Sequence, residues 1–434
     1  MENTHTQAAS ALFLLLLYLC ISCIGNVSLD AAPDPNAREA RTGRDKVSLY
    51  RQSSHEIIVP KDYPTIQEAI NNVSQNGTIL VYPGAYNENL KIYRSLTLKS
   101  YGGIAVLIAD PEVGLLMENA GSVVLEGFEI RPRIRTGADS IGILAEGKTQ
   151  AIVRFNRLID WAKSVYIRAG ASTVMEANTV ETNSYAESVD GMVIEAASGL
   201  IISNRFFIKS TSDYISGLTT RDSRGLVVSK NEVYILEKVR DVAVGLDFIN
   251  SEGDVSENRI FVKRATGVSI QGSQGIVLKQ NYISGIDSVG INLLWPSNEW
   301  DRALVKIIEN TVSGDSQSNS IGIVIQGLEA VLQNNIVTGN SRGVYFSFGS
   351  QGQLQNNLIT ANGDGVLINR DTIAWKLDNN QIIKNRVCGV RVEEQLPGRD
   401  AVPNIEGQGN WITGNTNGEL CPINFPWPPG FVKP

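Results

Sequence analysis

Short runs of alternating apolar and polar residues recur along most of the chain, and many of them begin at a glycine. Typical runs are GMVIEA from Gly191, GLDFIN from Gly245, GVYFSF from Gly343 and GVRVEE from Gly389. Apolar residues mostly occupy the first and third positions after the glycine, which is the period of two expected for a half-buried strand. The pattern therefore predicts many short strands that share one arrangement.

An Asn-x-apolar pattern separates these runs and recurs at intervals of 22 to 30 residues. Its members are Asn156, Asn178, Asn204, Asn231, Asn258, Asn281, Asn310, Asn335, Asn357, Asn380 and Asn410. A repeat of this length is typical of a solenoid, in which each coil stacks on the one before. Asparagine tolerates left-handed backbone in a turn, and its amide can bond the same residue one coil above. We interpret the series as a structural ladder.

One short amphipathic helix is predicted ahead of the strands, within the segment KDYPTIQEAINNV. Its narrow apolar stripe consists of Ile66, Ala69, Ile70 and Val73. Thr65 and Glu68 have the spacing of a capping box at the start of a helix. Because open strand edges at the end of a solenoid must be hidden, we expect this helix to cap the first coil.

The repeats resemble those of right-handed parallel β-helix proteins of the pectin lyase-like superfamily, including its NosD-type periplasmic branch. The stretch DYPTIQEAINNVSQNGTILVYPGAYNENLKI is similar to the N-terminal cap and first coil of many such proteins, pectin methylesterases among them. The resemblance covers residues 56–418. It implies an all-β, single-stranded right-handed parallel β-helix of about twelve coils with a short N-terminal capping helix. It implies no single activity, because the superfamily includes lyases, hydrolases, esterases, epimerases and inactive binders.

The N-terminal segment indicates export. An apolar run from Ala11 to Ile24 has the length of a signal-peptide core, although no Lys or Arg precedes it. We predict a signal peptide over residues 1–25. The alternatives are an N-terminal anchor, which would attach the protein to a membrane, and a lipoprotein leader modified at Cys20 or Cys23. The expected location is secreted, periplasmic or at the cell surface.

The remaining boundaries follow from composition. Residues 26–55 are polar and lack a period, so they are predicted to form a flexible linker. The solenoid is predicted over residues 56–420, and residues 421–434 are expected to form a C-terminal tail over the last coil. We expect a monomer.

The formal net charge of −7, from 38 basic and 45 acidic residues, argues against non-specific nucleic-acid binding. A polysaccharide or other glycan is the predicted partner. An anionic ligand would need a local basic patch, because the net charge of the chain does not attract it.

The repeat supplies a register in which equivalent residues of successive coils lie about 4.8 Å apart. The fourth position after the glycine alternates in charge over Glu146, Arg168, Glu195 and Arg221. Such a row favours a stack of ion pairs along the sheet. Arg168 is also a candidate for binding substrate.

A candidate catalytic group consists of Glu195, Arg221 and Asp247, which fall on three consecutive coils. Carboxylates beside an arginine resemble the arrangement with which pectate lyases bind Ca²⁺ and abstract a proton. This resemblance implies a lyase with Ca²⁺ as a candidate ion; no other cofactor is predicted and the metal is unassigned. The segment GLDFIN also resembles pectin methylesterases, with Asp247 as nucleophile or base, but the other motifs of that family are absent.

Both histidines of the chain precede residue 56, which excludes a histidine-dependent triad in the solenoid. It also argues against a histidine-ligated copper or zinc site.

An insertion between Gly290 and Asn310 contains LLWPSNEWDRA. Long insertions mark the face that a solenoid uses. Trp295, Trp300 and Asp301 are therefore candidates for stacking on and bonding a sugar. The alternative is that both rings pack on the solenoid wall.

A disulfide between Cys388 and Cys421 would suit an exported protein. However, Cys388 precedes the glycine of its coil by one residue, and Cys421 follows Gly418 by three. Four residues of extended strand span roughly 13 Å, which is beyond disulfide reach unless the last coil is distorted. The register therefore argues against the bridge.

Two functional hypotheses follow. The first is an exported protein that binds polysaccharide along a sheet face without catalysis. The second is a polysaccharide-active enzyme, with a uronate polysaccharide lyase favoured over a pectin esterase.

Overall fold

The computed structural model describes residues 54–432, except 135–138, 169, 237–240, 295–303, 316–318 and 394–402. The predicted signal peptide and almost all of the predicted linker lie outside the described residues. So do Trp295, Trp300 and Asp301 of the insertion.

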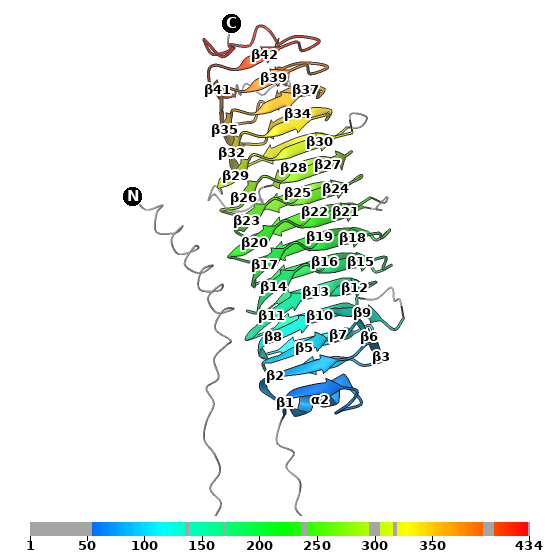
Figure 1. Ribbon diagram of the computed structural model, residues 1–434. Helices are drawn as coiled ribbons and strands as arrows, with labels where there is room; N and C mark the ends of the chain where they lie inside the picture. Colours follow the sequence, from blue (N-terminus) through cyan, green and yellow to red (C-terminus); the bar gives the residue numbers. More distant parts are fainter. Residues whose placement is uncertain are drawn as a thin grey trace, which may run out of the picture. The chain divides into compact units, whose positions relative to one another are not determined.

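The described residues form three long parallel sheets, here called sheets A, B and C (Figure 1). Sheet A has 15 strands, which are β1 (Ser54–Val59), β2 (Val73–Val81), β5 (Leu96–Ser100), β8 (Gly121–Glu126), β11 (Thr149–Arg154), β14 (Ser172–Glu176), β17 (Ser198–Ile202), β20 (Leu226–Ser229), β23 (Gly253–Ser256), β26 (Val277–Lys279), β29 (Leu304–Ile308), β32 (Glu329–Gln333), β35 (Gln351–Gln355), β38 (Ala374–Asp378) and β41 (Asn404–Glu406).

Sheet B has 14 strands, which are β3 (Gly84–Tyr86), β6 (Ala105–Ala109), β9 (Phe128–Pro132), β12 (Arg157–Ile159), β15 (Thr179–Thr182), β18 (Arg205–Ile208), β21 (Glu232–Ile235), β24 (Arg259–Val262), β27 (Tyr282–Ile286), β30 (Thr311–Gly314), β33 (Ile336–Thr338), β36 (Leu358–Thr360), β39 (Gln381–Ile383) and β42 (Trp411–Thr413).

Sheet C also has 14 strands, which are β4 (Leu90–Ile92), β7 (Val113–Glu118), β10 (Ile141–Glu146), β13 (Lys163–Arg168), β16 (Ser188–Glu195), β19 (Tyr214–Arg221), β22 (Val242–Ile249), β25 (Thr266–Gln271), β28 (Val289–Leu294), β31 (Ile321–Gln326), β34 (Arg342–Ser347), β37 (Asp364–Ile368), β40 (Val390–Val392) and β43 (Leu420–Cys421).

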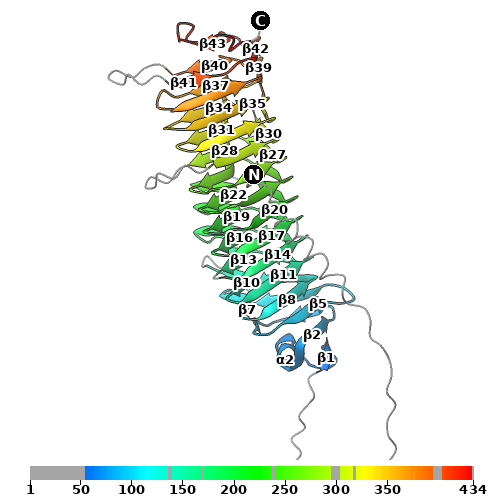
Figure 2. The ribbon, with the colours of Figure 1, turned by 90° about the vertical axis from the view of Figure 1, so that its left-hand side faces the viewer.

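Each coil contributes one strand to sheets C, A and B in turn, and every strand pairs in parallel with its equivalents on the neighbouring coils. Figure 2 shows the same stack from the side. Alternate side chains point inward and form one continuous apolar core, in which Trp161, Phe206, Phe248 and Phe346 are fully buried. The predicted all-β parallel solenoid is therefore confirmed.

The predicted capping helix is α2 (Ile66–Asn72), the one helix within the described residues. Thr65 is its N-cap, and the Thr65 hydroxyl accepts a hydrogen bond from the Glu68 amide at 3.1 Å. Ile66, Ala69 and Ile70 are buried against the first strands. Val73 leaves the helix and begins β2, so the predicted apolar stripe continues into the sheet.

The asparagine ladder is confirmed as a column of hydrogen bonds between sheets A and B. From Asn156 to Asn410, the backbone N–H of each asparagine donates to Oδ1 of the next at 2.8–3.0 Å. The side-chain Nδ2 donates to the same oxygen at 2.9–3.1 Å. These amides are buried, so the ladder satisfies polar groups that would otherwise be costly inside the fold.

One detail of that prediction is wrong. The left-handed residue of the turn is the one before each ladder asparagine, with φ of 57° at Phe155, 56° at Lys230 and 58° at Glu309. The ladder asparagine is therefore selected for its two bonds rather than for its backbone conformation. A second, shorter ladder of Asn340, Asn362, Asn385 and Asn415 was not predicted.

The argument against the disulfide is also wrong, because Cys388 and Cys421 are bonded, with their Cα atoms 6.4 Å apart. The last strand, β43, contains only two residues, and Gly418 ahead of it has a positive φ. The last coil is thus not an extended strand at this point, and the spacing of extended residues does not apply. The tail beyond it packs over the end of the core through Phe425 and Phe431.

Candidate functional site

The strands of sheet C bend outward at the glycine row. In β16 and β19, Asp190 pairs with Ser216 and Met192 with Leu218, while the glycines between them make no ladder pair. Thr219 Oγ1 nevertheless donates to Ser216 Oγ at 2.8 Å within one strand. Residues three apart point to opposite faces of a flat strand, so this contact requires a bend at Gly217.

Glycine is required at the bend. A Cβ on Gly217 would lie 2.6 Å from the Gly245 carbonyl oxygen and 2.6 Å from a Val233 methyl group. As a result, the residue before each glycine and the second residue after it face each other on the outside of sheet C. The register predicted from the sequence placed only the second residue after the glycine on this outer face.

The bend closes a polar network on itself. Asp190 accepts hydrogen bonds from the hydroxyls of Ser188 (3.1 Å), Ser216 (2.5 Å) and Thr219 (3.1 Å). Tyr214 lies beside them. Asp190 is 2% exposed, although it lies on the outer face of the sheet.

Asp247, a predicted catalytic residue, belongs to the same network. The Tyr214 hydroxyl donates to Asp247 Oδ2 at 2.9 Å, while Oδ1 is buried without a partner within hydrogen-bond distance. Burial raises the pKa of Asp247. Three weaker effects lower the same pKa, namely hydrogen bonds from Ser269 and Tyr214 and the positive charge of Arg221. Burial beside Asp247 also raises the pKa of Tyr214.

The other predicted catalytic residues lie in the expected register on sheet C. Glu195 is opposite Arg221, whereas Asp247 is opposite Thr219, two residues away along the strand. The Tyr166 hydroxyl bonds the Glu195 carboxylate from the preceding coil. The described residues contain no ion pair between Glu195 and Arg221.

Arg168, the predicted substrate-binding arginine of the Glu/Arg row, is paired. Its Nε donates to Glu146 Oε2 at 2.7 Å, and its guanidinium lies 5.5 Å from the Tyr166 ring centroid. The side-chain bond to Glu146 raises the pKa of Arg168. The Glu/Arg row therefore contains an ion pair between Glu146 and Arg168, as the ion-pair stack predicts.

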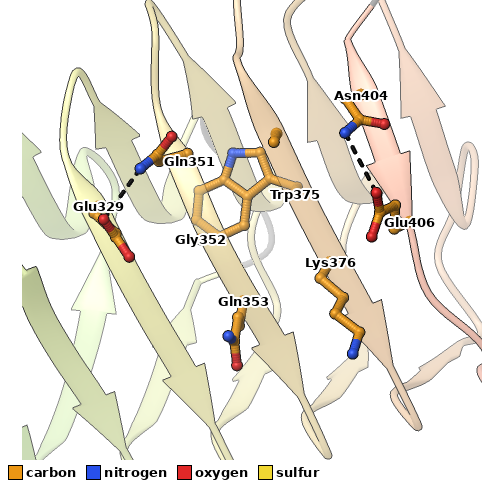
Figure 3. Close-up of a pocket in the computed structure, with 9 residues that line it drawn as sticks. Glu329, Gln351, Gly352, Gln353, Trp375, Lys376, Asn404 and Glu406 are labelled. Carbon is orange, nitrogen blue, oxygen red and sulfur yellow. Dashed lines mark hydrogen bonds between the residues drawn. The ribbon is translucent and has the colours of Figure 1, made fainter.

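A cavity of about 210 Å³ lies on a different face, the outer surface of sheet A near the C-terminal end (Figure 3). It extends over β32, β35, β38 and β41. The residues that line it are Glu329, Gln351, Gly352, Gln353, Ala374, Trp375, Lys376, Asn404 and Glu406.

The floor of this pocket forms because a glycine stands opposite a tryptophan. Gly352 pairs with Trp375, and with no side chain at Gly352 the indole extends toward the neighbouring strand (Figure 3). Trp375 is 1% exposed and stacks on Phe346 at a centroid distance of 3.5 Å. Its Nε1 donates to Ser350 Oγ at 3.2 Å, so the floor is fixed by packing and by a hydrogen bond.

The rim of the pocket is polar. Gln351 Nε2 donates to Glu329 Oε2 at 3.0 Å at one end, and Asn404 Nδ2 approaches Glu406 Oε1 at 3.4 Å at the other (Figure 3). Gln353 and Lys376 are exposed between them. Sequence analysis missed this site, because its residues come from four coils and no local motif links them. The five outward-facing amide and carboxylate side chains near Trp375 were the available signal.

The described residues contain no group of three or more histidine, cysteine or acidic side chains that could hold a metal ion. His55 is the one described histidine, and both described cysteines are in the disulfide. The donor set that copper prefers is therefore not assembled in the described part of the chain.

No described helix combines the length and the apolar character needed to cross a membrane.

Two family profiles match this chain. Residues 141–301 match "Right handed beta helix region", and residues 244–417 match "Periplasmic copper-binding protein (NosD)". Each match spans less than half of the chain. A cell surface glycoprotein of Methanothermus fervidus is 39% identical over 72 residues, which are 16% of this chain and 12% of that protein. The periplasm and the cell surface, which these two names state, agree with the predicted export.

Solved structures with a similar course of the chain are more distant. A periplasmic alginate epimerase, AlgG, has a TM-score of 0.44 and 16% identity, covering 79% of this chain and 76% of its own. The A-module of the mannuronan C-5 epimerase AlgE4 from Azotobacter vinelandii has a TM-score of 0.38 and 16% identity, covering 80% and 88%. The catalytic domain of a GH87 α-1,3-glucanase has a TM-score of 0.39 and 13% identity, covering 86% and 71%.

The three parallel sheets and the repeat profile define the class: the chain is a right-handed parallel β-helix repeat protein. Within that class, its C-terminal coils are similar to NosD-type proteins.

Proposed function

We propose that this protein is exported and binds a glycan through the outer face of sheet A, without catalysis. The observation that carries the proposal is the pocket over β32, β35, β38 and β41. Exposed amide and carboxylate side chains above a rigid floor, which Trp375 supports from beneath at 1% exposure, are suited to bonding the hydroxyls on the edge of a sugar.

The connections of the chain support this face. The two longest insertions, between Gly290 and Asn310 and between Gly389 and Asn410, join sheet C to sheet A at β29 and β41. β29 is adjacent to the first strand of the pocket, and β41 is its last strand. Insertions in a solenoid concentrate on the face that it uses.

Sheet B offers a less suitable aromatic surface. Phe207, Tyr234 and Phe261 stack on one another with centroids 4.9 Å apart and nearly parallel planes. Their faces are covered by their neighbours, so mainly their edges would meet a ligand. Stacking on a sugar requires a free face.

Export is supported by three observations. They are the N-terminal apolar run, the periplasmic and cell-surface locations of the matched family and protein, and the disulfide, a bond that is rare in reducing cytosol.

Affinity electrophoresis in gels loaded with a panel of neutral and charged polysaccharides tests the proposal. At least one polymer should retard the protein, and Gln353→Ala with Asn404→Ala should weaken that retardation severalfold. Gln150→Ala, an exposed glutamine on β11 of the same sheet, is the matched control. Unchanged mobility across the panel would overturn the proposal.

A separate arm tests the tryptophan insertion. Replacing Trp295 and Trp300 by Ala, with Asp301→Ala, should lower the affinity further if the insertion joins the binding face. Equal retardation would assign glycan binding to sheet A alone.

The lyase hypothesis has its own readout. Incubation with uronate polymers and Ca²⁺ should release no unsaturated products, since Asp247 is 2% exposed and a general base must reach the proton that it removes. Ultraviolet-absorbing products that disappear with Arg221→Ala would instead establish a lyase.

A further inference from the structure

The charges around the sheet A pocket are not balanced. Glu329 and Glu406 carry two negative charges, and Lys376 carries the single positive charge of the lining. Lys376 Nζ already lies 3.2 Å from Asp378 Oδ2, a carboxylate just beyond the lining. The lining therefore carries an excess of one negative charge, and its single ammonium group is already paired with a carboxylate outside it.

The two rim carboxylates mark the two ends of the pocket. Glu329 pairs with Gln351, Gln351 with Ala374 and Ala374 with Asn404, so the pocket spans three strand spacings. At about 4.8 Å per spacing, and with Glu406 two residues further along its strand than the partner row of Glu329, the Cα atoms of the two glutamates lie about 16 Å apart. This is long enough for a short oligosaccharide that runs along the solenoid axis.

The hydrogen-bond donors of the rim are largely used within it. The amide groups of Gln351 and Asn404 donate toward the two glutamates. Gln353 is the exception, because its Oε1 accepts from Gln355 at 3.0 Å and its Nε2 donates no hydrogen bond within the described residues. The pocket therefore offers mainly acceptors to a ligand. A ligand rich in donors suits this lining, and a carboxylate-bearing sugar does not, because it would require the cation that Asp378 holds.

We propose that the sheet A pocket recognises a glycan segment that carries protonated amino sugars, in preference to uronates. This inference rests on the proposed function and names its ligand class. The ammonium groups would lie near Glu329 and Glu406, and the ring hydroxyls would bond the amides between them.

Isothermal titration calorimetry with three length-matched oligosaccharides tests the proposal. The probes are a glucosamine oligomer, its N-acetylated neutral form and a uronate oligomer. We expect affinity to fall in that order. The advantage of the glucosamine oligomer should shrink as salt is added, because exposed charges are screened.

The variant Glu406→Gln removes one charge and keeps the shape of the side chain. It should weaken glucosamine-oligomer binding about two- to fivefold, the range of an exposed ion pair, and leave the neutral oligomer unaffected. Glu176→Gln on β14 is the matched control, since it changes the net charge of the protein equally at an exposed site of the same sheet. Equal effects of both variants would indicate non-specific attraction of a polycation and overturn the proposal.

The remaining outcomes separate this inference from the proposed function. Equal binding of the glucosamine and neutral oligomers, or a preference for the uronate oligomer, would overturn the charge selectivity and leave glycan binding intact. Binding of none of the three, together with no retardation in any polysaccharide gel, would overturn both.

Discussion

The middle of sheet C and the C-terminal part of sheet A both carry carboxylates and polar side chains at outward positions, yet they differ in accessibility. On sheet C the strands bend at the glycine row, so Asp190 and Asp247 are 2% exposed. On sheet A the residues around Trp375 are not folded onto each other, and Gln353 and Glu406 stay exposed. A residue that points away from the core of this solenoid is therefore exposed to solvent only where its strand does not bend and cover it. Polar residues stabilise the fold in the first region and are available to a ligand in the second.

The largest effect is expected at Asp190. Asp190→Ala removes the acceptor of three hydroxyls, two of them fully buried, and should lower the free energy of unfolding by about 3 kcal/mol or more. Urea denaturation followed by circular dichroism measures the change. Asp254→Ala, at an exposed carboxylate on β23, should cost less than about 0.5 kcal/mol. Similar losses for both variants would contradict the difference between buried and exposed outward positions.

A smaller effect of opposite sign is expected at Asp247. The pKa of Asp247 is higher in the folded state than in the unfolded state, so the protonated carboxyl favours folding. This stabilisation is lost as the pH rises from the ordinary aspartate pKa through the folded-state pKa of Asp247. Asp247→Asn keeps an acceptor for Tyr214 and removes the charge. It should stabilise the protein by about 1 kcal/mol at neutral pH.

The pH dependence supplies the control for that variant. The gain from Asp247→Asn should vanish at pH values below the ordinary aspartate pKa, where the wild-type carboxyl is neutral in both states. Denaturation midpoints at several pH values measure this. A gain that is constant with pH would mean that the charge of Asp247 is not its cause.

The smallest effect on stability is expected in the pocket. Gln353→Ala should change the free energy of unfolding by less than about 0.5 kcal/mol while it weakens glycan retardation. The same denaturation and electrophoresis experiments measure both quantities. A large loss of stability would place Gln353 with the buried residues of sheet C and remove the contrast between the two faces.

The sequence was sufficient to predict the solenoid because its signals are local and repeated. The glycine row and the asparagine ladder each recur about once per coil, so the register of most strands could be read directly. The capping helix was equally local, with Thr65 and Glu68 at the start of its apolar stripe.

The errors concern features that depend on three-dimensional shape. The bend at Gly217 brings Ser216 onto the same side as Thr219, and an alternating pattern cannot indicate it. The pocket around Trp375 needs four strands in contact, and its key position, Gly352, differs from the repeat only by a missing side chain. The disulfide was rejected because Cys421 was assigned to an extended strand that ends at that residue.

The asparagine ladder also bears on how the molecule could grow. Each ladder asparagine makes the same two hydrogen bonds with the next one, so its contacts within the ladder do not depend on how far it lies from either end. A gene segment that encodes one whole coil, from one asparagine to the next, could be duplicated or deleted while every remaining junction stays the same. The length of the molecule would then change in discrete steps of about 4.8 Å, each step adding or removing one strand of every face.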